Sequence, residues 1–404
     1  MDPSCKLSVV IPAYNEEEAI ASIIERTLVS RDSIVETSPV SSVEIIVVSD
    51  GSWDRTAEIA SQYEEIKLIS YAKNRGYGAA IKTGFENATG DILGFLDADG
   101  TCDPEFFAQL CKILIEGNAD IAIGSRMHPE SQMPRLRRLG NWLFAKIINF
   151  FGNTKITDSA SGMRVIKRDS LEKIYPLPDG LHFTPAMSTR AVLDRNLKIV
   201  ETPMPYEERT GRSKLSVVKD GVKFLKVIFD IALTHRPFKL FGAIGILFLV
   251  IALLYGIQPT IYYINNREIA EYMIYRFISI LTLTLAGINL IALGVLSDYI
   301  VSLIHNYDPW HGTRLGKFSE RFIFSKIPFI SALFFISGIV LNARTLYQYV
   351  TSGHIYLHWI YVLTGALLVL AGIELAALSV LRRIVLLLKE KLDFGRNHGG
   401  SDSL

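Results

Sequence analysis

The sequence predicts an α/β domain followed by an all-α membrane domain of four helices. Short β-branched runs alternate with helical stretches as far as about Glu207, which indicates a mostly parallel sheet covered by helices. Four long apolar segments follow. The chain has 404 residues, of which 49% are apolar, and a formal net charge of +1. This near-neutral charge names no partner, and we expect no nucleic-acid partner.

The expected strands of the first domain are five apolar runs rich in β-branched residues. They are KLSVVIPAY, VEIIVVSDG, IKLISYA, DILGFLDAD and ADIAIGS. Segments with helical patterns separate them, such as Glu16 to Ser30 and Pro104 to Leu114, whereas we interpret Arg31 to Ser42 as a loop. Ligands of open α/β sheets bind beyond the carboxyl ends of the strands, so the residues that follow these runs are the candidate site.

Two carboxylates, Asp97 and Asp99, end the run GDILGFLDAD. Adjacent like charges repel unless a positive group lies beside them, and a hard divalent cation such as Mg²⁺ or Mn²⁺ takes oxygen ligands of this kind. Magnesium usually completes its shell with water and substrate phosphates, so the pair suggests a diphosphate ligand. By itself Asp-x-Asp is weak evidence, because acidic residues are common in loops.

Two more strand ends carry candidate residues. Lys73, Asn74, Arg75 and Gly76 follow a strand and open a helix, which would place cations and free backbone N–H groups near an anionic ligand. The alternative is a turn with a solvated basic tip. Asp50 in VVSDGSWDRT either caps a turn or accepts hydrogen bonds from a base or ribose.

The membrane domain is expected to cross the bilayer four times. The spans are Phe238 to Ile257, Tyr275 to Val295, Ile327 to Tyr347 and Trp359 to Leu381. Lys and Arg are concentrated between spans two and three and in the tail, at Arg314, Lys317, Arg321, Lys326, Arg382, Arg383, Lys389, Lys391 and Arg396, whereas the other connections offer Arg267, Arg276 and Arg344. By the positive-inside rule, the first domain, the middle loop and the tail are cytoplasmic.

The N-terminal sequence and the cysteines are consistent with the expected cytoplasmic location of the first domain. The N-terminus lacks the basic, apolar and small-residue regions of a signal peptide. Cys5, Cys102 and Cys111 fit neither a disulfide framework nor the spacing of a zinc site.

Two segments have the pattern of helices lying in the membrane interface. Leu136 to Gly152 and Leu215 to Leu233 combine aromatic and aliphatic residues with several Lys and Arg residues. The alternative is an amphipathic helix packed on the sheet. The expected division of the chain is a cytoplasmic α/β domain at 1–214, an interfacial helix at 215–236, four spans at 237–384 and a cytoplasmic tail at 385–404.

The motifs in order resemble the family 2 glycosyltransferases, whose fold is the Rossmann-like GT-A fold. The likeness is strongest to dolichyl-phosphate mannose synthases and polyprenyl-phosphate glycosyltransferases, and the spans resemble their multi-spanning branch. The motifs are VVIPAYNEE, VVSDGSWDRT, KNRGYGAA, FLDADG, IGSR, DSASGMRVIKRD and RTGRSKLS.

This resemblance implies a role for each matching residue. Those expected to bind the nucleotide sugar are Pro12, Tyr14, Glu16, Val48, Asp50, Lys73, Asp97, Ala98, Asp99 and Arg126. Those expected on the acceptor side are Asp158, Ser161, Gly162, Arg209, Ser213 and Lys214. Asp97 and Asp99 would hold the metal, and the residues expected to act in catalysis are Asp99, Arg126, Arg209 and Lys214.

Two positions depart from the family pattern. Many relatives have two aspartates before Gly51, whereas this chain has Ser49 and Asp50. The mannose synthases place a glutamine metal ligand where this chain has Thr101, so a water or Asp103 is expected to complete the shell.

The implied activity is the inverting transfer of one hexose from a nucleotide sugar to a dolichyl or polyprenyl monophosphate, with GDP-mannose favoured over UDP-glucose. A lipid monophosphate is already ionised near pH 7, so no dedicated base is needed. One alternative is a processive polysaccharide synthase, but Gln132, Arg135 and Leu136 match its Gln-x-x-Arg-Trp motif poorly. The other is a membrane protein that senses a nucleotide sugar without turnover. A homo-oligomer is possible, and Glu374 and Asn289 lie within spans without an assigned role.

Overall fold

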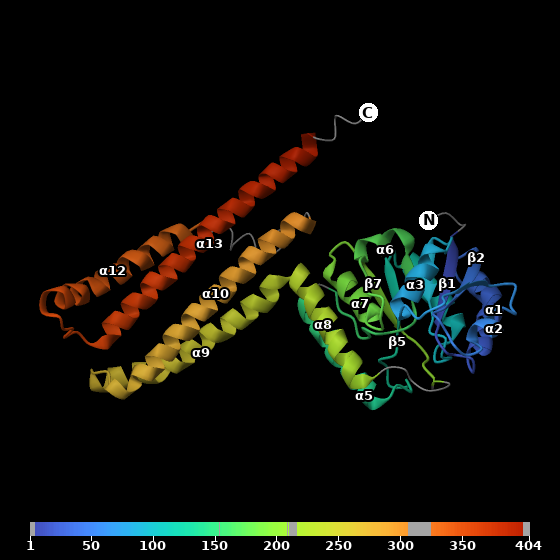
Figure 1. Ribbon diagram of the computed structural model, residues 1–404, viewed down its shortest axis with the longest axis horizontal. Coiled ribbons are helices and arrows are strands. Elements are labelled where there is room, and N and C mark those ends of the chain that lie inside the picture. The colour runs from blue at the N-terminus through green and yellow to red at the C-terminus, as the bar shows by residue number, and fades with distance from the viewer. Residues whose placement is uncertain (1–4, 153, 208, 210–215, 306–324, 399–404) are drawn as a thin grey trace. The chain divides into compact units, whose positions relative to one another are not determined.

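The protein consists of two compact units, residues Met1–Ala232 and Leu233–Leu404 (Figure 1). The computed structural model describes residues 5–152, 154–207, 209, 216–305 and 325–398. The first unit contains a seven-stranded sheet covered by helices, and the second contains four long helices.

The sheet is parallel except for one strand. The strands are β1 (Lys6–Ala13), β2 (Ser42–Ser49), β3 (Lys67–Ser70), β4 (Ile92–Phe95), β5 (Ile121–Ser125), β6 (Arg164–Lys167) and β7 (Ile199–Pro203), in the order β3-β2-β1-β4-β6-β5-β7. β6 runs antiparallel to both of its neighbours, with Arg164 opposite Phe95 of β4 and Ile123 of β5. The five runs of the sequence interpretation are therefore strands, and β6 and β7 were missed.

The helices of the first unit lie between the strands, except α8, which follows β7 and extends past Ala232 into the second unit. They are α1 (Ile20–Thr37), α2 (Thr56–Ala60), α3 (Tyr77–Glu86), the 3₁₀ turn η1 (Pro104–Phe106), α4 (Phe107–Glu116), α5 (Arg135–Phe151), α6 (Arg168–Ile174), α7 (Phe183–Leu193) and α8 (Val217–His235). The interpretation of Arg31 to Ser42 as a loop was wrong in its first half, because α1 continues to Thr37.

The core explains why the strand runs are almost continuously apolar. Leu7, Val9 and Ile11 of β1 and Ile45 and Val47 of β2 are all buried, because helices cover a mostly parallel sheet on both faces. A sheet buried in this way fixes the strand ends and the loops that follow them.

Helices α5 and α8 lie side by side in the first unit. Phe144 of α5 contacts Phe224 of α8 edge to face, with ring centroids 5.8 Å apart, and Phe151 contacts Phe229 at 6.3 Å. The outer side chains remain exposed, among them Leu139, Trp142, Phe150, Val218 and Val222. The two amphipathic segments of the sequence interpretation therefore pack against each other and both carry exposed apolar side chains.

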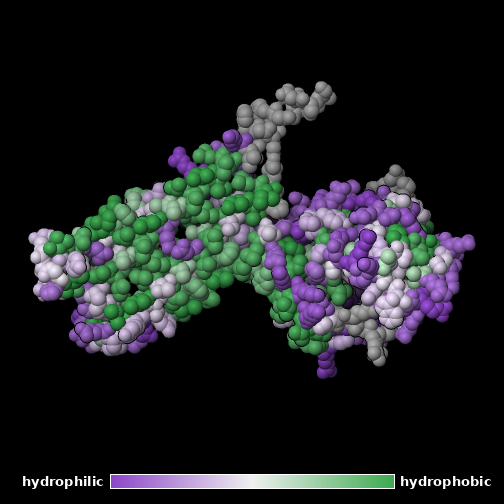
Figure 2. All heavy atoms as spheres, viewed as in Figure 1, coloured by the Kyte–Doolittle hydropathy of each residue, from purple (hydrophilic) through white to green (hydrophobic). Residues whose placement is uncertain are grey.

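The four helices of the second unit are long and apolar enough to cross a membrane. They are α9 (Pro237–Asn266), α10 (Ile274–His305), preceded by the 3₁₀ turn η2 (Glu271–Met273), α12 (Ile327–Ser352) and α13 (Trp359–His398). Each is longer than the span expected from the sequence. Apolar residues cover most of this unit in Figure 2.

The helices pack in two pairs, α9 with α10 and α12 with α13, and glycines allow close approach within each pair. A Cβ atom on Gly245 of α9 would lie 2.7 Å from the carbonyl oxygen of Gly287 in α10, and one on Gly338 of α12 would lie 2.6 Å from that of Gly365 in α13. α10 in turn packs on α13, where the Asn289 amide donates to Oε1 of Glu374 at 2.6 Å. Small residues permit this close backbone approach, and a polar contact joins the two pairs.

Candidate active site

Three neighbouring strands deliver their following loops to one edge of the sheet. β1 lies between β2 and β4, so the residues after Ala13, Ser49 and Phe95 follow strands that are adjacent in space. The first two loops are tied together, because the Asn15 side chain accepts a hydrogen bond from the Trp53 backbone at 3.0 Å and the Glu16 backbone donates to the Thr56 hydroxyl at 2.8 Å.

Asp97 is enclosed by groups from two other segments. The hydroxyl of Tyr77, at the start of α3, donates to Oδ1 at 2.6 Å. Gly162 approaches the other side so closely that a Cβ atom there would lie 1.9 Å from Oδ2. Burial and the charge of Asp99 raise the pKa of Asp97 to about 7. Only glycine fits at position 162 beside this carboxylate.

Asp99 is buried, and both of its oxygens have partners. Oδ1 accepts from the Thr101 hydroxyl at 2.7 Å and from the Thr101 backbone at 3.2 Å. Oδ2 lies 3.2 Å from Nη1 of Arg209, whose Nη2 also lies 2.8 Å from Oε1 of Glu16. Arg209 thus joins the loop after β1 to the loop after β4.

Asp50 holds the loop that opens α3. Its two oxygens accept hydrogen bonds from the backbone N–H groups of Arg75, at 2.7 Å, and Gly76, at 2.9 Å. Gly51, with φ of +68°, lets this turn approach Lys73 and Asn74. The expectation of free N–H groups at Arg75 and Gly76 was therefore wrong, because Asp50 satisfies both. The capping role is the one seen, and nucleotide binding by Asp50 stays a prediction.

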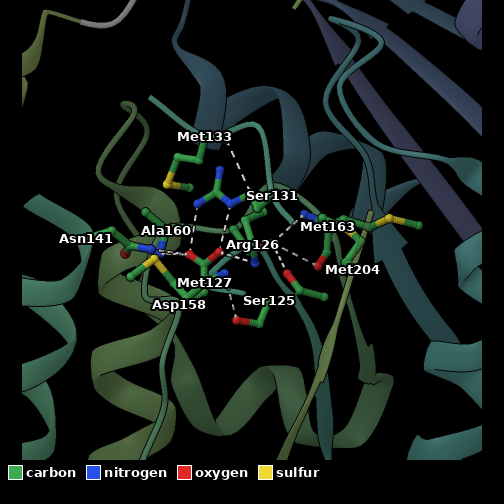
Figure 3. Close-up of polar contacts among 12 residues, drawn as sticks. Ser125, Arg126, Met127, Ser131, Met133, Asn141, Asp158, Ala160, Met163 and Met204 are labelled. Atoms are coloured by element: carbon green, nitrogen blue, oxygen red, sulfur yellow. Dashed lines mark hydrogen bonds and ion pairs between the residues drawn. The ribbon is translucent and has the colours of Figure 1, made fainter. Parts of the chain in front are cut away.

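Arg126 and Asp158 form a buried bidentate ion pair (Figure 3). Nε of Arg126 lies 2.8 Å from Oδ2 of Asp158, and Nη2 lies 2.9 Å from Oδ1. The Arg126 backbone also donates to Oδ2, and the amide of Asn141 in α5 donates to Oδ1 at 2.8 Å. The Arg126 guanidinium holds the pKa of Asp158 below its usual value although burial opposes this. Contact of Arg126 with a phosphate stays a prediction.

A second buried arginine supports the loop that contains Gly162. Arg164 is only 1% exposed. Its Nε and Nη2 donate to the Ser161 carbonyl, and Nη1 donates to the Ser188 hydroxyl at 3.0 Å. The Ser161 hydroxyl itself donates to the Gly124 carbonyl at 2.6 Å. Loop and strand β5 are therefore fixed together beside Asp97.

Comparison with known proteins shows the family to which this chain belongs. The description "Glycosyl transferase family 2" matches residues 8–175, and a "Domain of unknown function (DUF8752)" matches residues 237–392. A Haloferax volcanii protein named "Low-salt glycan biosynthesis hexosyltransferase Agl6" is 31% identical over 357 residues, which cover 86% of this chain and 81% of that protein. The chain belongs to glycosyltransferase family 2.

Two further proteins are similar to parts of this chain. The "Dolichyl-phosphate hexose transferase" of the same organism is 31% identical over 57% of this chain and 95% of its own length. Glucosyl-3-phosphoglycerate synthase from Mycobacterium tuberculosis, solved with Mn²⁺, UDP-glucose and phosphoglyceric acid, is a structural neighbour at 21% identity and a TM-score of 0.46, covering 56% of this chain and 80% of that chain.

The family match confirms two expectations from the sequence. The resemblance to lipid-phosphate sugar transferases of family 2 is confirmed, and so is an α/β glycosyltransferase domain followed by four apolar helices. The chain is a hexosyltransferase of this group. The matched region includes Asp50, Asp97, Asp99, Arg126 and Asp158, whereas Arg209 lies beyond it.

Several residues assigned to ligand binding from the sequence are covered in this glycosyltransferase. Val48, Asp158 and Ser161 have no exposed surface, and Pro12 and Ala98 are buried. By contrast, Lys73 is exposed and Tyr14 and Glu16 are partly exposed at the same edge. Ser213 and Lys214 lie outside the described residues. The roles assigned to all these residues stay predictions.

The donor set suits a hard cation. Asp97 and Asp99 supply carboxylate oxygens at the strand end, and Arg209 shows that the site accepts a positive group at Asp99. Thr101 is turned to Asp99, and Asp103 accepts from the Glu105 backbone at the start of η1. Among the described residues, no three acidic, His or Cys side chains are grouped as a protein-only metal cage. Magnesium commonly binds through one or two carboxylates and substrate phosphates, which fits this set.

Sequence reasoning missed the residues that position the acids. Tyr77 contacts Asp97, Asn141 and Glu201 contact Asp158, and Arg164 contacts Ser161 in the loop after Asp158. The contacts of Tyr77, Asn141 and Glu201 join residues that are far apart in the chain. The contact of Arg164 is local, with a residue three positions earlier. The one sequence signal was that Tyr77 and Arg164 lie within the quoted motifs.

Proposed function

We propose that this enzyme transfers a single hexose, with inversion, from a nucleoside-diphosphate sugar to a dolichyl or polyprenyl monophosphate. The observation that carries the proposal is the grouping of Asp97, Asp99 and Arg209 at the carboxyl edge of the sheet. A family 2 domain with this grouping is joined to four apolar helices, which suits a lipid acceptor. The relative named a dolichyl-phosphate hexose transferase supports the same acceptor class.

Asp97 and Asp99 would hold a divalent metal, Mg²⁺ or Mn²⁺. When bound, this ion supplies positive charge that stabilises the departing nucleoside diphosphate. Tyr77 orients Asp97 and Thr101 orients Asp99 through the hydrogen bonds described above. These side chains therefore preorganise the two carboxylates before the donor arrives.

The acceptor requires positioning more than proton removal. A phosphate monoester carries between one and two negative charges near pH 7, so its oxygen is already a nucleophile. Arg209 would compensate the charge of donor and acceptor phosphates at the moment when these anions meet. Arg126, paired with Asp158, would hold in place the loop from Asp158 to Met163, which we expect on the acceptor side. Lys214 is proposed as a further cation that compensates phosphate charge.

The surface formed by α5 and α8 would rest on the membrane. Leu139, Trp142 and Val222 are exposed apolar side chains, and Lys146 and Lys219 are exposed cations on the same helices. Such a combination favours the interface, with apolar groups among the acyl chains and cations near anionic headgroups. This arrangement would present the active site to a lipid whose phosphate lies at headgroup level.

We propose a cytoplasmic location for the catalytic unit. Lys326 precedes α12, and Arg382, Arg383 and Lys389 lie in the C-terminal part of α13. An even count of crossings would place these cations on the side of the first unit. Three further cations of the middle loop, Arg314, Lys317 and Arg321, lie outside the described residues. A cytoplasmic site has access to cytoplasmic nucleotide sugars.

The test is an assay of single-sugar transfer with purified full-length enzyme in detergent. The assay supplies Mg²⁺ or Mn²⁺, a polyprenyl monophosphate and either GDP-mannose, the donor favoured from the sequence, or UDP-glucose. We expect one sugar to be added and Asp99→Asn to lower the rate by about a hundredfold or more, because the substitution removes a charged group at the leaving phosphate.

Asp91→Asn is the matched control. Asp91 lies just before β4, at the opposite end of the strand that delivers Asp99, and we expect its variant to keep its rate. Products with several sugars would favour a processive synthase, and nucleotide binding without turnover would favour a sensor. Either result would overturn the proposal.

A further inference from the structure

We infer that Arg209 is the resident counter-cation of Glu16 and Asp99, and that it must release Asp99 before a divalent metal binds there. This inference rests on the proposed function and adds an exchange of cations at its central carboxylate. The guanidinium lies between the two acids, with Nη2 2.8 Å from Oε1 of Glu16 and Nη1 3.2 Å from Oδ2 of Asp99.

Both oxygens of Asp99 already have partners. Its Oδ1 accepts two hydrogen bonds from Thr101, one from the backbone and one from the hydroxyl. Its Oδ2 contacts the Arg209 guanidinium. A divalent cation that binds Asp99 therefore meets the positive charge of the arginine at the same carboxylate and competes with it.

The negative charges around this position favour a cation beside Asp99. Glu16 and Asp99 both contact Arg209, and the positive charge of Arg209 is among the groups that lower the pKa of Asp97. The side chain of Arg209 is 21% exposed and that of Asp99 is 11% exposed, so solvent screens the pair only in part. Without a cation the carboxylates would repel one another.

Arg209 also has spare hydrogen-bonding capacity for an anion. Its Nε is buried and has no hydrogen-bond partner among the residues that the structure describes. A buried N–H without a partner is costly, and a phosphate oxygen would satisfy it. Arrival of the donor diphosphate with its metal would thus give Arg209 a new partner when it loses Asp99.

Tyr206 and Glu207, which precede Arg209, have contacts of their own near the acids. The Glu207 backbone donates to the Thr101 carbonyl at 3.0 Å, and Tyr206 lies beside the Arg126 guanidinium, 5.5 Å from ring centroid to Cζ. These contacts fix the segment two and three residues before Arg209. The exchange therefore requires a movement of the arginine side chain and leaves the preceding segment in place.

The experiment measures Mn²⁺ binding to the full-length protein by electron paramagnetic resonance, without donor or acceptor. We expect Arg209→Ala to bind Mn²⁺ about three- to tenfold more tightly than the wild type, because the competing ion pair is gone. Arg209→Lys should stay near the wild type, since it keeps the charge. Arg55→Ala, which removes a cation paired with Glu58 on α2, is the matched control and should bind as the wild type does.

With added nucleoside diphosphate, we expect the wild type to bind Mn²⁺ more tightly than Arg209→Ala. Mn²⁺ binding by the wild type should then tighten more than binding by Arg209→Ala, because only the wild type offers its guanidinium to the phosphates. Arg209→Gln gives a second neutral variant, and thermal unfolding verifies that each variant is folded.

Equal or weaker binding by both neutral variants, with binding still abolished by Asp99→Asn, would overturn the inference and leave the proposed metal site standing. Absence of Mn²⁺ binding in every variant, with and without nucleoside diphosphate, would instead overturn the metal-dependent function and the exchange with it. The two failures are thus distinguishable by the same titration.

Discussion

Asp97 shows how a single residue balances opposing influences. Burial and the neighbouring Asp99 charge raise its pKa to about 7, while the Tyr77 hydrogen bond and the charges of Arg126 and Arg209 act in the opposite direction. An acid with its pKa raised in this way prefers to be neutral in the folded protein. It becomes a good ligand for a cation only when that cation offsets the cost of ionisation.

A prediction for stability follows from this shift. The folded pKa lies above the usual value of 3.8, so the folded state binds more protons than the unfolded state between these values. Stability of the metal-free protein should therefore fall as pH rises from about 4 to about 7 and then level off. Asp97→Asn lacks the titrating group and should not lose this stability. The difference in unfolding temperature, variant minus wild type, should therefore increase from pH 5 to pH 8.

Thermal unfolding in the presence of EDTA checks this prediction. A change of 1 kcal/mol corresponds to about 2–4 °C for domains of about this size. Added Mn²⁺ should reduce the difference between Asp97→Asn and the wild type at pH 8. A difference that stays constant with pH would show that Asp97 is ionised throughout this range.

The sequence located the acidic residues but not their partners. Asp97, Asp99 and Asp50 follow recognisable strands, so their place at the sheet edge was predictable. The Tyr77 hydroxyl, the covered state of Asp158 and the capping by Asp50 depend on contacts across the fold. Local periodicity carries no information on such contacts.

Among the elements, α5 and α8 were easier to predict than β6 and β7. The amphipathic pattern of a long helix extends over several turns, whereas β6 has four residues and β7 has five. β6 also reverses direction within a parallel sheet, which an alternation of strands and helices does not indicate. Each of these two amphipathic helices was predictable by itself, but their packing against each other was not.

A fluorescence experiment tests contact of α5 with the bilayer. Trp142 of α5 is 50% exposed, and Trp53, in the loop after β2, is 81% exposed. In proteoliposomes with brominated lipids, we expect quenching in a variant that keeps Trp142 as its only tryptophan. A variant that keeps only Trp53 is the control and should remain unquenched. Equal quenching of the two would contradict an interfacial position of α5.

At the scale of the whole molecule, the second unit consists of two tightly packed helix pairs. α9 packs on α10 and α12 on α13 through glycines, and α10 meets α13 at the Asn289–Glu374 hydrogen bond. The number of spans was predictable from length and hydropathy. Their pairing was not, because it depends on small residues facing each other on different helices.

Cysteine labelling tests the proposed orientation of the whole chain. Cys5, Cys102 and Cys111 are buried, so the native protein should give little background labelling. In intact cells, a membrane-impermeant maleimide should react with His354→Cys, which lies between α12 and α13. It should react with Glu390→Cys, near the end of the last span, only after permeabilisation. The reverse pattern would place the catalytic unit outside.

The antiparallel strand β6 also affects how this enzyme can diversify. Arg164 starts β6 opposite both Phe95 and Ile123, so a single register fixes the preceding loop, Asp158 to Met163, against the strands that precede Asp97 and Arg126. Gly152 and residues 154–156 take no part in these ladders. Under the proposed function, in which the loop at Asp158 to Met163 faces the acceptor, insertions or deletions there would alter the acceptor side over evolutionary time while Asp97 and Asp99 keep their places. New acceptors could then be acquired without redesign of the donor site.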